Sequence, residues 1–251
     1  MKEFLYKAAH LADWSGNPSA ATMFTKTAKE KKRGCKMESE QVRIFNENRE
    51  AIGIASREEV HRKGYWHEVF QCWFVRIENG VRKIYFQLRS DRKKDFPGLY
   101  DITAAGHLMA DESVEDGVRE VEEELGIGVS YNELTPLKVI KASIKKDHFF
   151  DNEIANIFLY ECNQPLEKFK LQKEEVSGIV QADFDQFYNL WLGERDEVDV
   201  KGFCLNDDEE RINVNEKINK LHFVPHEVSY YQSVVKEIEK NFTQSEDHLR
   251  R

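Results

Sequence analysis

Three glutamates near the middle of the chain have a spacing that could support metal chemistry. Glu120, Glu123 and Glu124 stand at positions i, i+3 and i+4, so on a helix their carboxylates fall on one face. They occupy the last turns of such a helix, where the helix dipole disfavours negative charge. Two interpretations are open: the acids form a solvated face, or they converge on a hard divalent cation such as Mg²⁺, whose oxygen coordination relieves their repulsion.

A helix over residues 114–125 would position these carboxylates. Its apolar residues recur on one stripe, at positions 114, 118, 121 and 125. Ser113, followed three residues later by Asp116, fits a capping box at the start of this helix. Gly126 stands where a helix end favours positive φ, which predicts the end of the helix at residue 125.

The order of residues around the glutamates resembles the Nudix box. Residues 119–127, Arg-Glu-Val-Glu-Glu-Glu-Leu-Gly-Ile, match its second half, REUxEExGU with U apolar, and Gly106 with Glu112 matches its first half, Gly-x5-Glu. Six residues separate Glu112 from Arg119 where the box normally has seven, and this difference falls before the turn that bears the glutamates. On these residues the chain is identified as a member of the Nudix superfamily.

This resemblance implies metal-assisted hydrolysis of an organic diphosphate, in which the cation lowers the pKa of the water that attacks phosphorus. Arg119 would orient a box glutamate through a charge-assisted hydrogen bond. The general base is left open between Glu123, Glu153 and another box carboxylate. The cation would be Mg²⁺ or Mn²⁺. Its implied ligands are the box carboxylates and one backbone carbonyl: Glu120, Glu123, Glu124, Gly106 and Glu112.

The resemblance covers roughly residues 40–195 and points to the branch that is similar to isopentenyl-diphosphate isomerase. Residues 52–67 look like the first strand and the HRxGxxH segment of that branch, and residues 87–101 continue the match. Isomerases carry a catalytic Cys just before Ser-His-Pro, whereas this chain has Ala-Ala-Gly-His-Leu at residues 104–108. The main expectation is therefore a hydrolase. The alternatives are an isomerase and a non-catalytic, nucleotide-binding Nudix module.

Other polar residues in these segments have two interpretations each. The isomerases use histidines in comparable segments, so His61, His67 and His107 are either metal ligands or residues that orient loops through hydrogen bonds. Asp151 and Glu153 are either further metal-ligating or basic carboxylates or ordinary loop acids.

Substrate contacts are expected from a basic patch and from two aromatic residues. Arg89, Lys93 and Lys94 directly precede the box and are expected to clamp phosphate groups. Tyr65 and Trp66 either stack on a ring of the substrate or belong to the core. The expected substrate is a nucleoside diphosphate derivative or another small organic diphosphate.

The resemblance implies an α+β Nudix fold, in which a mixed β-sheet is sandwiched between helices (α/β/α), with a C-terminal helical extension. Helical spacing predicts helices over residues 183–192 and 226–240. Alternation and turn residues predict strands over residues 41–45, 51–55, 69–77, 81–88, 99–105, 137–144, 154–162 and 176–180.

Composition divides the chain into three expected parts: a flexible leader over residues 1–36, a Nudix domain over 37–195, and a charged extension with a terminal helix over 196–251. The leader holds eight Lys/Arg and three Asp/Glu, although the whole chain has a net charge of −9, so the rest is strongly acidic. An acidic body repels the phosphate backbone, which argues against nucleic acid as a partner. The terminal helix offers a surface for a homodimer.

Hydrophobic residues make up 40% of the 251 residues, enough for a sizeable core. No apolar run approaches the roughly 18 residues of a membrane-spanning helix, so no membrane partner is expected. The four cysteines form no CxxC pair, which argues against a disulfide framework or a zinc finger and favours a cytoplasmic protein.

Overall fold

The computed structural model describes residues 40–249, so the expected leader over residues 1–36 lies outside the described residues. The helices are α2 (Arg57–Lys63), α3 (Arg119–Leu125), α4 (Phe184–Leu192) and α5 (Val228–Leu249), with 3₁₀ turns η1 (Glu115–Val118), η2 (Tyr131–Glu133), η3 (Leu166–Lys168) and η4 (Lys220–His222). The strands are β1 (Gln41–Phe45), β2 (Ala51–Ser56), β3 (Trp66–Glu78), β4 (Val81–Arg89), β5 (Tyr100–Asp101), β6 (Ala104–His107), β7 (Thr135–Lys146), β8 (Phe149–Glu161), β9 (Val176–Asp183), β10 (Val198–Leu205) and β11 (Arg211–Ile218).

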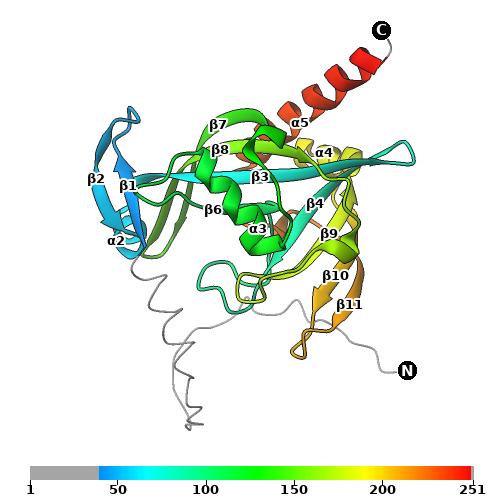
Figure 1. Cartoon of the computed structure of the whole chain (residues 1–251), viewed down its shortest axis with the longest axis horizontal. Helices are drawn as coiled ribbons and strands as arrows, with labels where there is room; N and C mark the ends of the chain where they lie inside the picture. The colour runs from blue at the N-terminus through cyan, green and yellow to red at the C-terminus, as the bar shows by residue number, and fades with distance from the viewer. Residues whose placement is uncertain (1–39, 250–251) are drawn as a thin grey trace. The chain divides into compact units, whose positions relative to one another are not determined.

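The strands form one sheet around the long central strand β3 (Figure 1). Its main path runs β11-β10-β9-β4-β3-β1-β2, while β6 and β8 also pair with β3, β5 pairs with β4, and β7 pairs with β8. The β3–β8 pairing is parallel and the others are antiparallel, so the sheet is mixed, as expected.

Helices cover both faces of the sheet because β3 is apolar on both faces. Val69, Trp73 and Val75 belong to the core that contains the buried residues of α4 and α5. Phe70 and Phe74 point the other way and belong to the core that contains the buried residues of α3. This period-2 alternation with both faces buried is typical of a strand between two helical layers. The expected α+β fold with an α/β/α sandwich is confirmed.

The strand expected over residues 99–105 is interrupted, so its predicted continuity was wrong. It forms β5, which pairs with β4, and β6, which pairs with β3. Between them the buried Thr103 hydroxyl donates to the Tyr85 carbonyl at 2.7 Å and accepts the Phe74 amide at 3.0 Å. These bonds satisfy the backbone where the chain crosses from one strand to the other.

Helix α2 was not predicted; it lies within residues 52–67, which were expected to contain a first strand and the HRxGxxH segment. The Ser56 hydroxyl caps this helix by accepting the Glu59 amide, and Gly64 ends it at φ 70°. This Ser-x-x-Glu pattern with a following glycine is a recognisable helix signal. The helix expected over residues 114–125 exists, but its first turn is the 3₁₀ turn η1.

The charged segment after residue 195 adds two strands that were not predicted. β10 pairs with β9 and β11 pairs with β10, so the sheet continues into this segment. The expected terminal helix is confirmed as α5 and begins at Val228. None of the helices within residues 40–249 has both the length and the apolar character needed to cross a membrane.

Candidate functional site

Arg119, the first residue of α3, connects the acidic side chains of the site. Its guanidinium donates to both carboxylate oxygens of Glu112, at 2.6 and 2.9 Å, and to Glu120 Oε1 at 2.6 Å. It also donates to Glu123 Oε2 at 3.4 Å and to the His107 carbonyl at 3.2 Å. A planar fork of five donors suits such paired contacts. Arg119 therefore fixes the carboxylates of Glu112 and Glu120 relative to strand β6.

Glu120 and Glu124 are one helical turn apart and their carboxylates are largely withdrawn from solvent. Glu124 is 5% exposed, and its Oε2 accepts the Ala105 amide at 3.2 Å and the Gln87 amide group at 3.3 Å. Burial, with the charge of Glu120, raises the pKa of Glu124 to about 8. Burial also raises the pKa of Glu120 to about 7, although the Arg119 charge acts in the opposite direction. A divalent cation would stabilise both carboxylates in their charged form.

The third expected metal ligand of the helix, Glu123, lies at the solvent boundary. Its side chain is 58% exposed, whereas that of Glu120 is 14% exposed. On this side of α3, Glu124 is therefore buried, Glu120 is half-buried and Glu123 is exposed. Gly106, on β6, lies directly against the Glu120 carboxylate.

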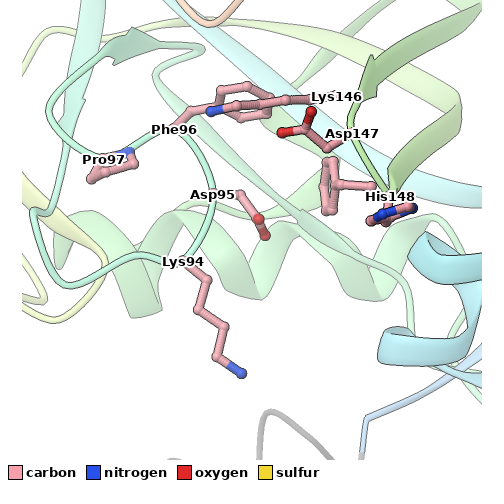
Figure 2. Close-up of a pocket in the computed structure, with 8 residues that line it drawn as sticks. Lys94, Asp95, Phe96, Pro97, Lys146, Asp147 and His148 are labelled. Carbon is pink, nitrogen blue, oxygen red and sulfur yellow. The ribbon is translucent and has the colours of Figure 1, made fainter. Parts of the chain in front are cut away.

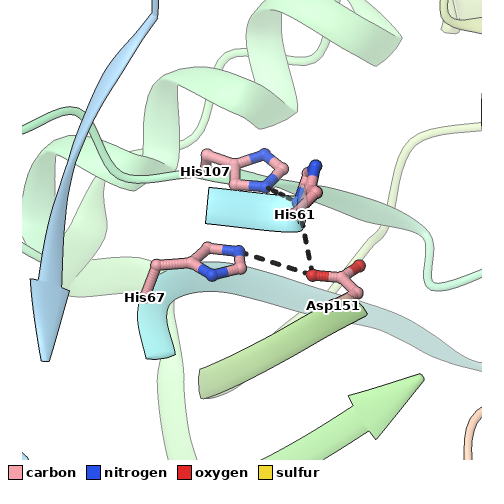
Figure 3. A group of neighbouring side chains, drawn as sticks. All are labelled: His61, His67, His107 and Asp151. Carbon is pink, nitrogen blue, oxygen red and sulfur yellow. Dashed lines mark hydrogen bonds and ion pairs between the residues drawn. The ribbon is translucent and has the colours of Figure 1, made fainter. Parts of the chain in front are cut away.

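A second polar cluster lies beside the glutamates and comes from four different elements (Figure 3). His61 on α2 lies 3.3 Å from His107 on β6, Nε2 to Nε2, and 3.4 Å from Asp151 Oδ1 on β8. His67 Nε2 on β3 lies 3.5 Å from the same Asp151 oxygen. Their potential ligand atoms all fall within 4.8 Å of one another.

The electrostatics of this cluster suit a metal ion. Burial lowers the pKa of His67 to about 4 and that of His107 well below its ordinary value, so both rings are neutral near pH 7. Burial opposes ionisation of Asp151, but the neighbouring His61 and His67 rings hold its pKa below the ordinary value. His67 Nε2 and Asp151 Oδ1 are buried without a hydrogen-bond partner. Neutral imidazoles and a carboxylate are ligands that suit Zn²⁺ and other transition ions.

Glu153 lies next to this cluster because of the parallel register between β3 and β8, which places it opposite His67. Burial, with the charges of Asp151 and Asp101, raises the pKa of Glu153 well above its ordinary value. Its Oε2 accepts a hydrogen bond from Gln71 Nε2 at 3.1 Å. A carboxyl with a raised pKa beside a candidate metal site is suited to take up a proton.

Arg89 is engaged in organising the loop that follows β4. Its guanidinium donates to Asp101 Oδ2 at 2.7 Å and to the carbonyls of Asp95 and Phe96, at distances of 2.8–3.2 Å. The Arg89 side chain is only 15% exposed. In this structure it therefore shapes the loop over residues 90–99, which bears the two expected phosphate-binding lysines.

Those two lysines take different positions. Lys93 forms an ion pair with Glu175 and its side chain is 13% exposed. Lys94 lines a cavity of about 340 Å³ between this loop and the β7–β8 turn (Figure 2). Its lining combines basic, acidic and aromatic side chains: Lys94, Asp95, Phe96, Pro97, Lys146, Asp147, His148 and Phe149. The Phe149 ring lies 4.8 Å from the His61 ring, so the cavity adjoins the histidine cluster.

Tyr65 and Trp66 lie on the side of the β1–β2 hairpin. Tyr65 packs against the small apolar cluster that includes Val60. The Trp66 indole donates to Glu47 Oε1 at 2.8 Å, and the Lys141 ammonium lies 4.4 Å from the centre of the Trp66 ring. Both rings therefore have protein partners in this structure.

Comparison with known proteins decides the family. The NUDIX domain family matches residues 66–200. An uncharacterized Nudix hydrolase from Clostridium acetobutylicum is 38% identical over 200 residues, which cover 80% of this chain and 97% of the relative. The chain belongs to the Nudix family.

Two further similarities accompany this match. An isopentenyl-diphosphate Delta-isomerase from Saccharopolyspora erythraea is 27% identical over 151 residues, covering 59% of this chain and 74% of that protein. A crystal structure from Deinococcus radiodurans aligns with a TM-score of 0.47 at 17% identity, covering 62% of this chain and 91% of that one. The family expected from the box is confirmed, and the expected enzyme class, a Nudix-type pyrophosphohydrolase, agrees with it.

The matched Nudix segment leaves out two elements that reach the site region. His61 lies on α2, before residue 66, and α5 follows residue 200. Gln87 and Gln71, which bond Glu124 and Glu153, were not expected as site residues. Each is a polar residue between two apolar neighbours in its strand, which is a weak signal because it does not show what the side chain contacts.

Proposed function

We propose that this Nudix protein is a metal-dependent hydrolase that cleaves the diphosphate linkage of a nucleoside diphosphate derivative or another small organic diphosphate. The observation that carries the proposal is the pair formed by the buried Glu124 and the half-buried Glu120, whose pKa values burial raises to about 8 and about 7. Two adjacent carboxyls withdrawn from water are costly unless a cation or protons compensate their charge.

The box residues fit a hard divalent cation. Glu120, Glu123 and Glu124, with the Gly106 carbonyl and more weakly Glu112, would hold Mg²⁺ or Mn²⁺, because these ions prefer oxygen ligands. When bound, the cation supplies Lewis-acid polarisation of the phosphoryl oxygens and a lowered pKa for water. The raised pKa values of Glu120 and Glu124 support this assignment, because a bound cation would compensate the negative charge and favour the ionised carboxylates.

The side chains of the protein itself would position the cation-binding carboxylates and accept a proton. Arg119 holds Glu112 and Glu120 through charge-assisted hydrogen bonds, so the cation-binding carboxylates do not have to be ordered during the reaction. Two carboxylates are suited to act as the general base. Glu123 is exposed to water, and Glu153 has a raised pKa.

The substrate would extend away from the glutamates toward the loop over residues 90–99. Lys93 and Lys94 on this loop would compensate phosphate charge, and Arg89 maintains the loop through its bonds to Asp101 and the loop carbonyls. The cavity that contains Phe96 and Phe149 would receive the group attached to the diphosphate. Aromatic side chains in that cavity support a ring-containing group such as a nucleobase.

The test is phosphate release from a panel of organic diphosphates, coupled to a phosphatase, with and without Mg²⁺. Glu120→Gln is compared with Glu122→Gln, an exposed residue on the same helix. Metal-dependent release that Glu120→Gln lowers at least about 100-fold, and Glu122→Gln leaves within twofold, supports the hydrolase. Circular dichroism establishes that both variants fold. No release from any diphosphate contradicts the proposal.

An isopentenyl-diphosphate isomerase is the second candidate, favoured by the cluster of His61, His67, His107 and Asp151. Against it, the described cysteines, Cys72, Cys162 and Cys204, lie in or directly after strands, and β6 begins with two alanines where the isomerases have their thiol. Conversion of isopentenyl diphosphate without phosphate release would favour the isomerase. Binding of an intact nucleotide without turnover would favour a non-catalytic module. Light scattering would test the homodimer for which the terminal helix was expected to offer a surface.

A further inference from the structure

The C-terminal helix α5 reaches the site region through one side chain. Tyr230, which is 3% exposed, donates its hydroxyl hydrogen to Gln71 Oε1 on β3 across an oxygen–oxygen distance of 2.5 Å. The two residues are 159 positions apart in the sequence. Tyr230 also stacks on the His226 ring, with the ring centres 4.5 Å apart. The hydroxyl is thus fixed from the side of α5 and directed into the sheet.

Gln71 links Tyr230 to Glu153 through two hydrogen bonds. Its Oε1 is used by Tyr230, so its Nε2 faces Glu153 Oε2 and donates to it at 3.1 Å. Gln71 is 1% exposed, and β3 carries it between its neighbours β6 and β8. A carboxylate oxygen only accepts hydrogen bonds, so the amide presents Nε2 to Glu153 and Oε1 to Tyr230, whose hydroxyl can turn its hydrogen to donate. The Tyr230 hydroxyl thereby anchors the other end of the Gln71 amide.

One oxygen of Glu153 remains outside this chain of bonds. Within residues 40–249, Gln71 is the hydrogen-bond donor to the Glu153 side chain, and it uses Oε2. The Tyr230–Gln71–Glu153 chain thereby holds the carboxylate through one oxygen, Oε2.

We propose that Tyr230 is a positioning residue of the hydrolytic site, which acts through Gln71 to orient the carboxylate of Glu153. This inference rests on the proposed function, in which Glu153 is one of the two general-base candidates. It also means that α5, which lies outside the matched NUDIX segment, contributes a positioning side chain to the site. Without the Tyr230 hydroxyl, Gln71 is free to turn, and Glu153 loses its fixed direction while the surrounding core stays packed.

Tyr231 offers a matched control on the same helix. It is 1% exposed and donates its hydroxyl to the Val224 carbonyl at 2.7 Å, while its ring stacks on Trp191 at 3.7 Å between ring centres. Tyr230→Phe and Tyr231→Phe each remove one buried hydroxyl and one hydrogen bond. The losses of folding stability should therefore be similar, and only the first substitution interrupts the path to Glu153.

The experiment measures kcat and KM for the best diphosphate of the panel in wild type, Tyr230→Phe, Tyr231→Phe, Gln71→Met and the Tyr230→Phe/Gln71→Met double variant. We expect Tyr230→Phe to lower kcat about tenfold with KM within twofold, because an oriented proton acceptor contributes to turnover more than to binding. Tyr231→Phe should change kcat less than twofold. In the Gln71→Met background, Tyr230→Phe should lower kcat by less than a further twofold, because Gln71→Met already removes the amide that links Tyr230 to Glu153.

Equal kcat values for the two phenylalanine variants would overturn the inference. It would also be overturned if Tyr230→Phe lowered kcat as much in the Gln71→Met background as it does in wild type. If wild type cleaves no diphosphate, the proposed function fails separately. Crystal structures of the two variants then decide the positioning role. A displaced Gln71 amide and Glu153 carboxylate in Tyr230→Phe alone supports it, and unchanged positions overturn it.

Discussion

The carboxylate of Glu120 lies directly against the backbone of Gly106. A Cβ atom built on Gly106 would come within 2.1 Å of the Glu120 carboxyl carbon and 2.2 Å of its Oε1. A Cβ atom at residue 106 would force these side-chain atoms to move, so the Glu120 carboxylate can occupy this position only because residue 106 is a glycine. The first glycine of the box thus has a steric role toward a candidate metal ligand, in addition to its carbonyl.

Gly106→Ala should therefore displace Glu120 and lower diphosphate hydrolysis about 100-fold, because small misplacements of a positioned group are costly. Isothermal titration should also show weaker Mg²⁺ binding. Gly128→Ala is the control, since a Cβ atom there meets no atom within 4 Å. Equal activity of the two variants would contradict the close approach of Gly106 and Glu120.

Glu124 should make the stability of the metal-free protein depend on pH. Burial raises its pKa to about 8 in the folded state from an ordinary value of 4.5, so in this interval the folded state holds a proton that the unfolded state has lost. Unfolding free energy should therefore fall as the pH rises from about 4.5 to 8, by at most about 1.4 kcal/mol per pH unit for one proton. Glu124→Gln should remove this part of the dependence.

Urea unfolding in EDTA at several pH values measures this effect. Glu122→Gln, which changes an exposed acid on the same helix, should keep the wild-type slope. Saturating Mg²⁺ should stabilise wild type most at the upper end of the interval, where the carboxylates are ionised. A slope that is the same in wild type and Glu124→Gln would refute the prediction.

The histidine cluster should bind a transition ion independently of the glutamates. Free Zn²⁺ at about 100 times its dissociation constant stabilises a folded protein by about 2.7 kcal/mol, which corresponds to a Tm increase of roughly 5–10 °C for a chain of this size. His61→Ala should lose most of this increase because it removes one of four converging ligands. The exposed His148→Ala should keep it. Differential scanning fluorimetry that shows equal shifts in both variants would argue against this site.

Arg119→Lys tests whether the site needs only the positive charge of Arg119 or also the hydrogen-bond geometry of its guanidinium. A lysine keeps the positive charge but cannot donate in parallel to both oxygens of Glu112 while holding Glu120. We expect kcat/KM to fall about 10- to 100-fold, the range found when partners that orient metal ligands are lost. Arg195→Lys, the same change at an exposed site, should have no measurable effect. Wild-type kinetics for Arg119→Lys would show that charge alone suffices.

Residues close together in the sequence account for most of what could be predicted. The i, i+4 spacing of Glu120 and Glu124, the positive φ of Gly126 at 66° and the strand β1 all follow from local periodicity and turn chemistry. The strand at residues 99–105 was mispredicted because Thr103 bonds to β3 and β4, and no local pattern encodes such a partner.

The sequence by itself determined the family, the helix that bears the box and the residue types that surround a cation. Only the tertiary structure decided that Glu124 is buried while Glu123 is exposed, and that Arg89 maintains a loop. It also placed Glu153 opposite His67 and linked Tyr230 to Gln71. The physical reason is that these contacts depend on strand order and register, which the whole buried core sets through packing between segments far apart in the chain.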